Sequence, residues 1–400
     1  MNTLNKIFKR GLKSSILTAL RKIVIIFLME ISDYSMRLSC KKKIRKIHKN
    51  LKLKKNKSDI ELLNIHVKKW RKLSHYVNTK YIQVYKHCSG IKSENFIPED
   101  VYYNIVEPCL NYYPIAKAES DKNNYQKGKF AEYFPKTILR NINGVFYNEN
   151  YQYVDLNDKS LLFYLKPYKE IIVKPSIESG KGKSLRLFEK TDGCFICDKG
   201  EKINCNLLNN AFKQNFVIQE RLLQHHKMKM FNKSSLNTIR VNTYRSVVNE
   251  SIIILNSVVR FGIPGSLLSN TSLGGGSIKI NNNGFMEKFG INHLNGARFT
   301  RVSNIKLENP FEIPKYEKIK EIAKGIANEF PYSRLLGIDF VIDIEENIRI
   351  LEVNNSSLGI NNHQMTGGPY FHTYTDDVIE YCLNKYDRRV RRQKAVLNIV

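Results

Sequence analysis

The chain has 400 residues, with 65 Lys or Arg against 37 Asp or Glu, which gives a formal net charge of +28. Apolar residues make up 42% and charged residues 26%, an ordinary globular composition that excludes collagen-like, mucin-like and wholly disordered chains. The seven Cys are few, odd in number and scattered, which excludes a disulfide scaffold and favours a reduced, cytoplasmic protein.

The first predicted element is a basic amphipathic helix within residues 1–57. Residues 6–57 contain 17 Lys or Arg and only two acids. The apolar run at 23–29 is too short to span a bilayer, which needs roughly 20 apolar residues. Two interpretations stay open, namely peripheral contact with an anionic inner membrane face and a solvated helix packed on its own domain. Nucleic acid is a disfavoured partner, because the basic run lacks interleaved aromatic residues.

Residues 58–165 form a second region, helical at 58–90 and rich in loops at 91–135. Short β-branched runs then predict strands at 170–174, 216–219, 238–241, 251–255 and 348–353. Apolar spacing predicts one helix over 314–330. Strands with interspersed helices indicate an α+β fold, and residues 387–400 form a basic tail.

A strand followed by a glycine loop is the first block that carries chemistry. Lys174 ends the strand, and Ser179, Gly180, Lys181 and Gly182 follow it. Glycine lets the backbone approach a phosphate closely, and lysine supplies charge. The spacing does not match a Walker A loop, and a surface hairpin turn is the alternative.

A predicted hairpin over 337–355 is the second block. Glu352 and Asn354 are two residues apart and so share one face of a strand, while Asp339 lies on the partner strand. Three oxygen ligands of this kind suit Mg²⁺ with phosphate oxygens completing the shell. The alternative is that these residues simply face solvent.

Two further segments lie between these blocks. The first is a strand end at Gln219, Glu220 and Leu222, which could be a hinge that meets a purine and ribose. The second contains Asn237 and Arg240. An arginine there could neutralise a transferring phosphoryl group. His363, after the hairpin, could face an acceptor or be structural.

Taken in order, these blocks resemble an ATP-grasp enzyme, and the chain resembles the sugar-transfer-associated ATP-grasp family, which is related to alpha-L-glutamate ligases. The resemblance runs from about residue 70 to 381. Its most specific marks are Ser-Leu-Asn-Thr-Ile-Arg at 235–240 and Glu-x-Asn at 352–354; others are Asp-Lys-Asn at 121–123 and Val-Arg-Phe-Gly at 259–262.

The resemblance implies an ATP-grasp fold with a small lobe at 166–225 and a large lobe at 226–386 that grip ATP and Mg²⁺. Lys174 would hold the α-phosphate, the 179–182 loop would cover the β- and γ-phosphates, and Gln219, Glu220 and Leu222 would form the hinge. Asp339, Glu352 and Asn354 would ligate the metal, and Arg240, Asn237 and Arg260 are the catalytic candidates. An upstream lysine is also expected; Lys136 fits the spacing, and Lys122 competes with it.

The implied activity is ATP-dependent carboxylate–amine ligation through an acyl phosphate. The partners would be a small carboxylate and an amine, with the family's name pointing to an amino sugar or lipid-linked sugar of a surface polysaccharide. Two alternatives remain: a kinase that phosphorylates a hydroxyl, and a catalytically inert basic scaffold at the membrane surface.

Overall fold

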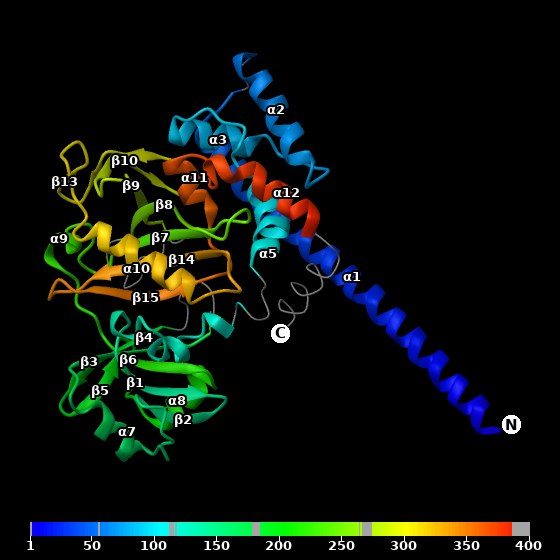
Figure 1. The fold of residues 1–400 in the computed structure, drawn as a ribbon. Helices are drawn as coiled ribbons and strands as arrows, with labels where there is room; N and C mark the ends of the chain where they lie inside the picture. Colours follow the sequence, from blue (N-terminus) through cyan, green and yellow to red (C-terminus); the bar gives the residue numbers. More distant parts are fainter. Residues whose placement is uncertain are drawn as a thin grey trace.

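A computed structural model of the chain describes residues 2–54, 57–111, 116, 118–177, 185–263, 265 and 274–385, and in the first helix it describes side chains at residue 20 and from residue 23 onward. Two β-sheets form two lobes, the large lobe above the small lobe in Figure 1. The α+β class and the two lobes expected from the sequence are present.

The small lobe is built on a six-stranded antiparallel sheet in the order β2-β1-β6-β3-β4-β5. Two helices pack apolar side chains against one face of this sheet. The sheet already begins at residue 137, so the small lobe includes chain upstream of residue 166, where we expected it to start. The elements are β1 (Thr137–Ile142), β2 (Val145–Asn148), α7 (Asp158–Leu165), β3 (Glu170–Pro175), β4 (Arg186–Thr191), β5 (Cys194–Cys197), α8 (Cys205–Phe212) and β6 (Phe216–Glu220).

The large lobe is built on a seven-stranded sheet in the order β11-β10-β9-β8-β7-β14-β15. Its longest helix is α10, and the apolar side of that helix covers one face of the sheet. The elements are α9 (His226–Lys229), β7 (Thr238–Arg245), β8 (Ile252–Phe261), β9 (Gly276–Ile280), β10 (Met286–Asn292), β11 (Arg298–Phe299), β12 (Arg301–Val302), β13 (Ile305–Lys306), α10 (Tyr316–Asn328), β14 (Leu335–Ile342) and β15 (Ile348–Asn354).

The N-terminal helices pack together with the last helices of the chain. Trp70 is fully buried among them, and Ile44 and Ile47 of the first helix pack with Tyr85 and Met365. The elements are α1 (Asn2–Asn50), α2 (Ile60–Arg71), α3 (Lys80–Ser89), α4 (Glu99–Val101), the π-helical turn η2 (Tyr102–Val106), α5 (Glu107–Leu110), α11 (Ile360–Gly367) and α12 (Thr375–Lys385); short 3-10 turns occur at η1 (Lys57–Asp59), η3 (Lys122–Lys127), η4 (Ala131–Tyr133) and η6 (His372–Tyr374).

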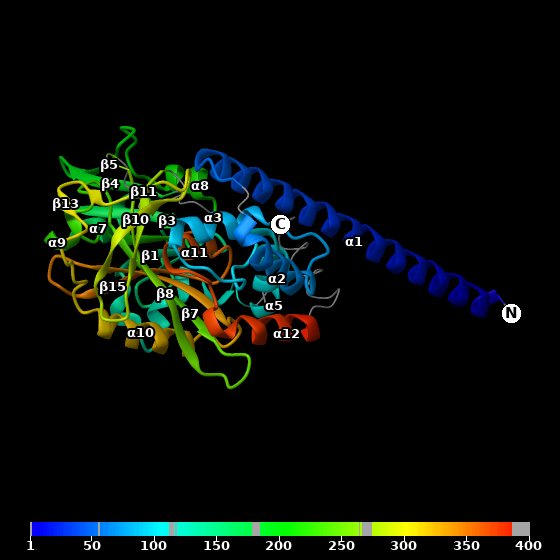
Figure 2. The same cartoon turned by 90° about the horizontal axis from the view of Figure 1, so that it is seen from above.

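The first helix is unusual because only its second half packs on the lobes. In both Figure 1 and Figure 2 the N-terminal turns of α1 stand clear of the rest of the molecule. No helix in the described ranges combines the length and apolar content needed to cross a membrane.

The secondary structure expected from the sequence agrees with these elements. All five predicted strands are present as β3, β6, β7, β8 and β15, and the predicted helix is α10. The helical stretch predicted over 58–90 is divided into α2 and α3. The basic tail at 387–400 lies outside the described residues.

Candidate active site

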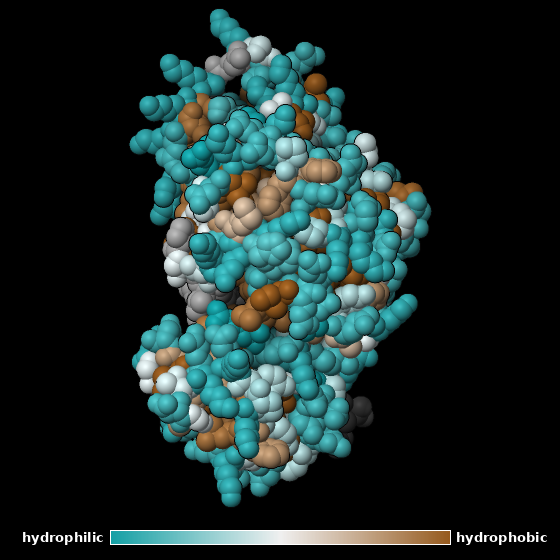
Figure 3. Space-filling view, turned by 90° about the vertical axis from the view of Figure 1, so that its left-hand side faces the viewer, coloured by the Kyte–Doolittle hydropathy of each residue, from teal (hydrophilic) through white to brown (hydrophobic). Residues whose placement is uncertain are grey.

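A cavity of about 870 Å³ is lined by residues of both lobes. Strands β3, β6 and the start of β4 supply the small-lobe side, and β7, β14 and β15 supply the large-lobe side. Figure 3 shows a mostly hydrophilic surface that narrows between the upper and lower lobes, with apolar residues in separate patches. Among the described lining residues, seven Lys or Arg face four Asp or Glu, which suits a polyanion such as a triphosphate.

Alternation along the large-lobe strands decides which side chains reach this cavity. Ile239 and Ile338 point into the core beneath α10. Since successive strand residues point to opposite faces, Arg240 and Asp339 point the other way, toward the cavity. They are direct cross-strand partners, and Asp339 is in turn paired with Glu352 on β15. The sheet therefore aligns an arginine and two carboxylates side by side.

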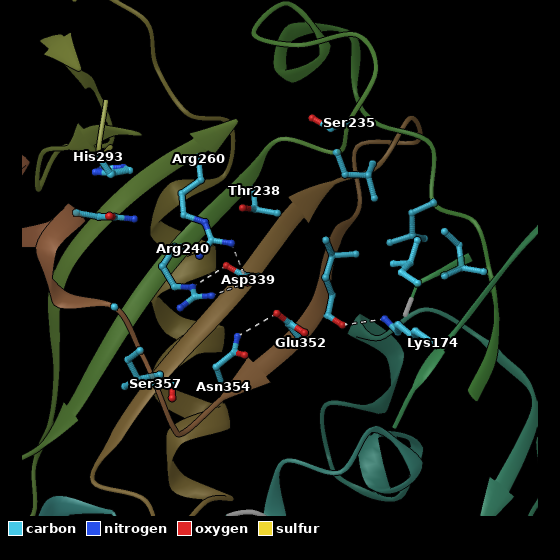
Figure 4. Close-up of a pocket in the computed structure, with 18 of the residues that line it drawn as sticks. Lys174, Ser235, Thr238, Arg240, Arg260, His293, Asp339, Glu352, Asn354 and Ser357 are labelled. Carbon is cyan, nitrogen blue, oxygen red and sulfur yellow. Dashed lines mark hydrogen bonds and ion pairs between the residues drawn. The ribbon is translucent and has the colours of Figure 1, made fainter. Parts of the chain in front are cut away.

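Asp339 is the centre of a buried arginine cluster (Arg240, Arg260 and Asp339; Figure 4). Arg240 donates from Nε to one carboxylate oxygen at 2.6 Å and from a terminal nitrogen to the other at 2.7 Å, and Arg260 adds a contact at 3.3 Å. Gly337 makes room for this arrangement, because a Cβ there would lie 2.6 Å from a terminal nitrogen of Arg240.

Charge balance within the arginine cluster sets its ionisation. Burial acts to raise the pKa of Asp339, but the two guanidinium charges outweigh it and hold that pKa below its usual value. Burial, with repulsion from Arg240, lowers the pKa of Arg260 to about 10. All three groups therefore stay charged at neutral pH.

Glu352 is the centre of a second cluster, the lysine cluster (Lys122, Lys174 and Glu352). The ammonium of Lys122 lies 3.7 Å from the Glu352 carboxylate, and that of Lys174 donates to the backbone carbonyl of Leu351 at 3.3 Å. Burial, with repulsion from Lys122, lowers the pKa of Lys174 to about 7, although Glu352 opposes the shift. Lys174 comes from the small lobe and Glu352 from the large lobe, so this cluster joins the two.

The residues predicted to hold Mg²⁺ are brought together and offer suitable oxygen atoms. The amide nitrogen of Asn354 donates to Gly337 at 3.2 Å and to Glu352 at 3.3 Å, which leaves the amide oxygen as its ligand atom. Three N–H bonds use three of the roughly four lone-pair sites of Asp339. In the described residues no group of three or more His, Cys, Asp or Glu could hold a metal. The set of two carboxylates and one amide would need phosphate oxygens to complete the octahedral shell of Mg²⁺.

A comparison with protein families matches residues 144–378 to the description "Sugar-transfer associated ATP-grasp". This match covers more than half of the chain. The chain belongs to the sugar-transfer-associated ATP-grasp family. A search of curated proteins found none that matches it.

Solved structures of ATP-grasp enzymes resemble this family member only distantly. The ATP-grasp ligase PsnB, in a complex with a minimal precursor, Mg and ADP, is 13% identical, with 67% of this chain and 61% of that chain covered and a TM-score of 0.36. D-alanyl-alanine synthetase A from Vibrio cholerae is 16% identical, with 68% and 67% covered and a TM-score of 0.39. This chain thus spans about three fifths of the length of PsnB.

The segment 219–223, which contains the predicted hinge, lines the cavity. Apolar residues line the cavity beside this segment, a setting that suits a planar base; they are Ile172, Leu187, Leu222 and Leu351. The carboxylate of Glu220 is held by the backbone N–H of Lys136 at 2.9 Å and by Arg349 at 3.0 Å.

Gln219 and Thr137 tie this end of the sheet together. The side-chain nitrogen of Gln219 donates to the Thr137 hydroxyl at 3.0 Å, which fixes β6 against β1 just before the hinge. Gln219 also lines the cavity.

Two predicted site residues point elsewhere. Asn237 is fully buried and donates to Gln224, Met228 and Asn232 at 2.9 Å each, so it fixes the loop before β7 and does not line the cavity. The side chain of Lys136 is half exposed and pairs with Glu149 at 2.8 Å. Of the two competing lysines, the structure brings Lys122, not Lys136, to the carboxylates. Ser179, Gly180, Lys181 and Gly182 lie outside the described residues.

The sequence interpretation did not foresee that α1 and a second histidine line the cavity. Lys43 of α1 reaches the cavity while pairing with Glu99 at 2.8 Å. His293 lies there beside His363, one of whose two predicted positions is near an acceptor. Burial lowers the pKa of His293 to about 3 and that of His363 well below its ordinary value, so both are neutral. Only the fold reveals these contacts, because no local spacing links α1 to the strands.

Proposed function

We propose that the chain is an ATP-dependent carboxylate–amine ligase that acts through an acyl phosphate. The observation that carries the proposal is the lysine cluster, in which Lys122 lies 3.7 Å from the Glu352 carboxylate and Lys174 of the small lobe donates to the backbone carbonyl of Leu351, the residue before Glu352. Lys174 of small-lobe strand β3 and the carboxylates of Asp339 and Glu352 line one cavity, together with apolar side chains such as Ile172 and Leu187.

The chemistry follows from charge. A carboxylate oxygen of the substrate attacks the γ-phosphorus of ATP, and the bond to ADP breaks. The amine nitrogen then attacks the carbonyl carbon, the C–O bond to phosphate breaks, and the amine loses a proton. The products are an amide, ADP and phosphate.

The residues of the cavity have distinct roles in this proposal. Lys174 lines the cavity and neutralises the phosphates, Lys122 adds positive charge beside Glu352, and the hinge at 219–223 holds the base between apolar side chains. Arg260 and Arg240 stabilise negative charge at the reacting carboxylate. Asp339, Glu352 and Asn354 would hold Mg²⁺, which when bound neutralises phosphate charge.

The acceptor class is the finer part of the proposal. The family's description associates it with sugar transfer, and we propose an amine on a sugar, free or lipid-linked, as the acceptor. The end of the cavity near Lys43, Ser357 and His363 is where it would bind, opposite the hinge.

The test is ADP release measured over amino acids combined with amino sugars and nucleotide sugars. We expect ADP, free phosphate and an amide in equal amounts, and loss of all three in Glu352→Gln. Phosphate recovered on a hydroxyl product would favour the kinase alternative. No rise in melting temperature with Mg-ATP would favour the inert scaffold, since ligand at 100 times Kd stabilises by about 2.7 kcal/mol.

A further inference from the structure

The helix α1 has two differently used faces. Met36, Ser39, Cys40 and Lys43 line the catalytic cavity, and Cys40 is buried in the packing against α3. This face attaches the second half of α1 to the large lobe.

The opposite face carries an apolar stripe that nothing in the described protein covers. Its six side chains are separated alternately by four and three residues, which keeps them in one row along a helix. Between 47% and 65% of the surface of each is exposed. They are Leu20, Val24, Phe27, Ile31, Tyr34 and Leu38.

The same row continues as a basic segment. Lys42, Arg45 and Lys49 follow Leu38 at steps of four, three and four residues, and all three are exposed. One face of α1 is therefore apolar in its projecting part and cationic where it reaches the large lobe. We call this row, from Leu20 to Lys49, the outer stripe.

The charge of the outer stripe decides between two occupants. A second copy of the chain could pair its apolar residues in a coiled coil, but a parallel pair would bring the three cations of each copy together. An anionic lipid surface instead complements them, and each Lys or Arg near such a surface contributes to binding. The net charge of +28 adds to this preference.

We propose that the outer stripe of α1 docks on an anionic phospholipid membrane, with its apolar residues among the headgroups and acyl chains and its cations on lipid phosphates. The helix would lie in the interface without spanning the bilayer. The proposal goes beyond the ligase function and does not depend on it.

A consequence concerns the catalytic cavity. The cavity-lining side of α1 is separated from the outer stripe by the helix itself, about 10 Å across. Docking would hold the α1 end of the cavity at that distance from the lipid headgroups. A membrane-anchored acceptor would then be within reach.

The test is flotation of the full chain with vesicles of phosphatidylcholine alone or with 30% phosphatidylglycerol (roughly one anionic lipid in three, enough to attract cationic segments). We expect binding only to the anionic vesicles, weakened by salt. Lys42→Gln/Arg45→Gln/Lys49→Gln should weaken binding on the order of a hundredfold, and Phe27→Glu should weaken it at least tenfold.

Matched controls lie on the small lobe. Phe163 is 73% exposed, comparable with Phe27 at 65%, and Lys159, Lys169 and Lys199 are exposed lysines. Phe163→Glu and the triple Lys→Gln variant at those positions should bind vesicles as the wild type does.

Three results would overturn the proposal. They are equal binding to neutral and anionic vesicles, equal loss in the small-lobe controls, and lipid-free self-association that Phe27→Glu abolishes. The Mg-ATP melting shift of each outer-stripe variant should equal that of the wild type, so a failure here and a failure of the ligase proposal are distinguishable.

Discussion

The arginine cluster and the lysine cluster have the same composition, two cations around one carboxylate, but they differ in burial. The Asp339 side chain is 3% exposed and the Glu352 side chain 37%. Arginine keeps its proton under all ordinary conditions, whereas buried lysine readily loses it. The arginine cluster thus keeps its charges within the large lobe. In the lysine cluster, which joins the two lobes, the charge of Lys174 can change near neutral pH.

We expect the largest difference in unfolding free energy between the two clusters when the central carboxylate of each is replaced by an amide. Asp339→Asn leaves two buried guanidinium groups without their counter-charge, so we expect unfolding free energy to fall by about 3–5 kcal/mol. Denaturant unfolding measures this. Glu250→Gln, which breaks the exposed pair with Arg334, is the matched control and should cost at most about 1 kcal/mol. An equal fall in unfolding free energy in Asp339→Asn and Glu250→Gln would show that burial does not make the arginine cluster more important for stability than an exposed pair.

The corresponding change in the lysine cluster should affect binding instead of stability. Glu352→Gln is expected to unfold within about 1 kcal/mol of the wild type, because its side chain is partly exposed. The stabilisation of about 2.7 kcal/mol that Mg-ATP gives at 100 times Kd should be lost. Thermal unfolding with and without Mg-ATP tests this, and a retained shift would exclude Glu352 from the metal site.

The two candidate lysines upstream of the Lys174 strand, Lys122 and Lys136, should differ in their effect on Mg-ATP binding. Lys122→Ala should weaken Mg-ATP binding on the order of tenfold or more, since a hydrogen bond to a charged group contributes about 1.5–3 kcal/mol. Lys136→Ala removes only an exposed pair with Glu149 and should change the dissociation constant less than twofold. Titration calorimetry compares the two, and the reverse order would restore Lys136 as the nucleotide ligand.

Lysine and arginine should also differ in their response to pH. The folded chain holds the Lys174 proton only up to about pH 7, whereas the unfolded chain holds it to about pH 10.4. Stability should therefore rise with pH between these values, by up to about 1.4 kcal/mol per unit. Lys174→Met should flatten this rise and be more stable than the wild type near pH 6.5.

The control for this pH dependence is Lys136→Met, which alters an exposed lysine and should leave the slope unchanged. Arg260, with a pKa lowered only to about 10, contributes no titration between pH 7 and 9. Urea unfolding at pH 6.5, 7.5 and 8.5 gives the slopes, and parallel slopes for the wild type and Lys174→Met would refute the assignment.

The smallest effect should come from the exposed pair of Lys136 and Glu149. Glu149→Gln is expected to change the unfolding free energy by about 1 kcal/mol or less, because both side chains are about half exposed. Comparison with Asp339→Asn then spans the range from an exposed pair to a buried cluster. A loss above about 2 kcal/mol would show that the exposure of this pair is not what limits its contribution.

Alternation and local spacing determined much of the site. Glu352 and Asn354 had to share a strand face because they are two residues apart, and β-branched runs fixed the strands that carry Lys174 and Arg240. Such patterns act within a few residues, so the sequence alone predicts them.

Tertiary structure decided which of these side chains meet. Asn237 and Arg240 lie on one short segment, yet the first is used to fix a loop and the second pairs with Asp339. Lys136 preceded the strand at the expected spacing and Lys122 was its competitor, yet the tertiary structure brings Lys122, and not Lys136, to Glu352.

By itself the sequence determined the strands, the basic helix and the family, because these depend on periodicity, composition and short motifs. The tertiary structure decided the pairing of Asp339 with two arginines, the choice of lysine and the contribution of α1 to the cavity. These depend on contacts between residues roughly 80 to 250 positions apart. No local pattern in the sequence reveals such contacts, because burial and charge balance in the folded chain determine which residues become partners.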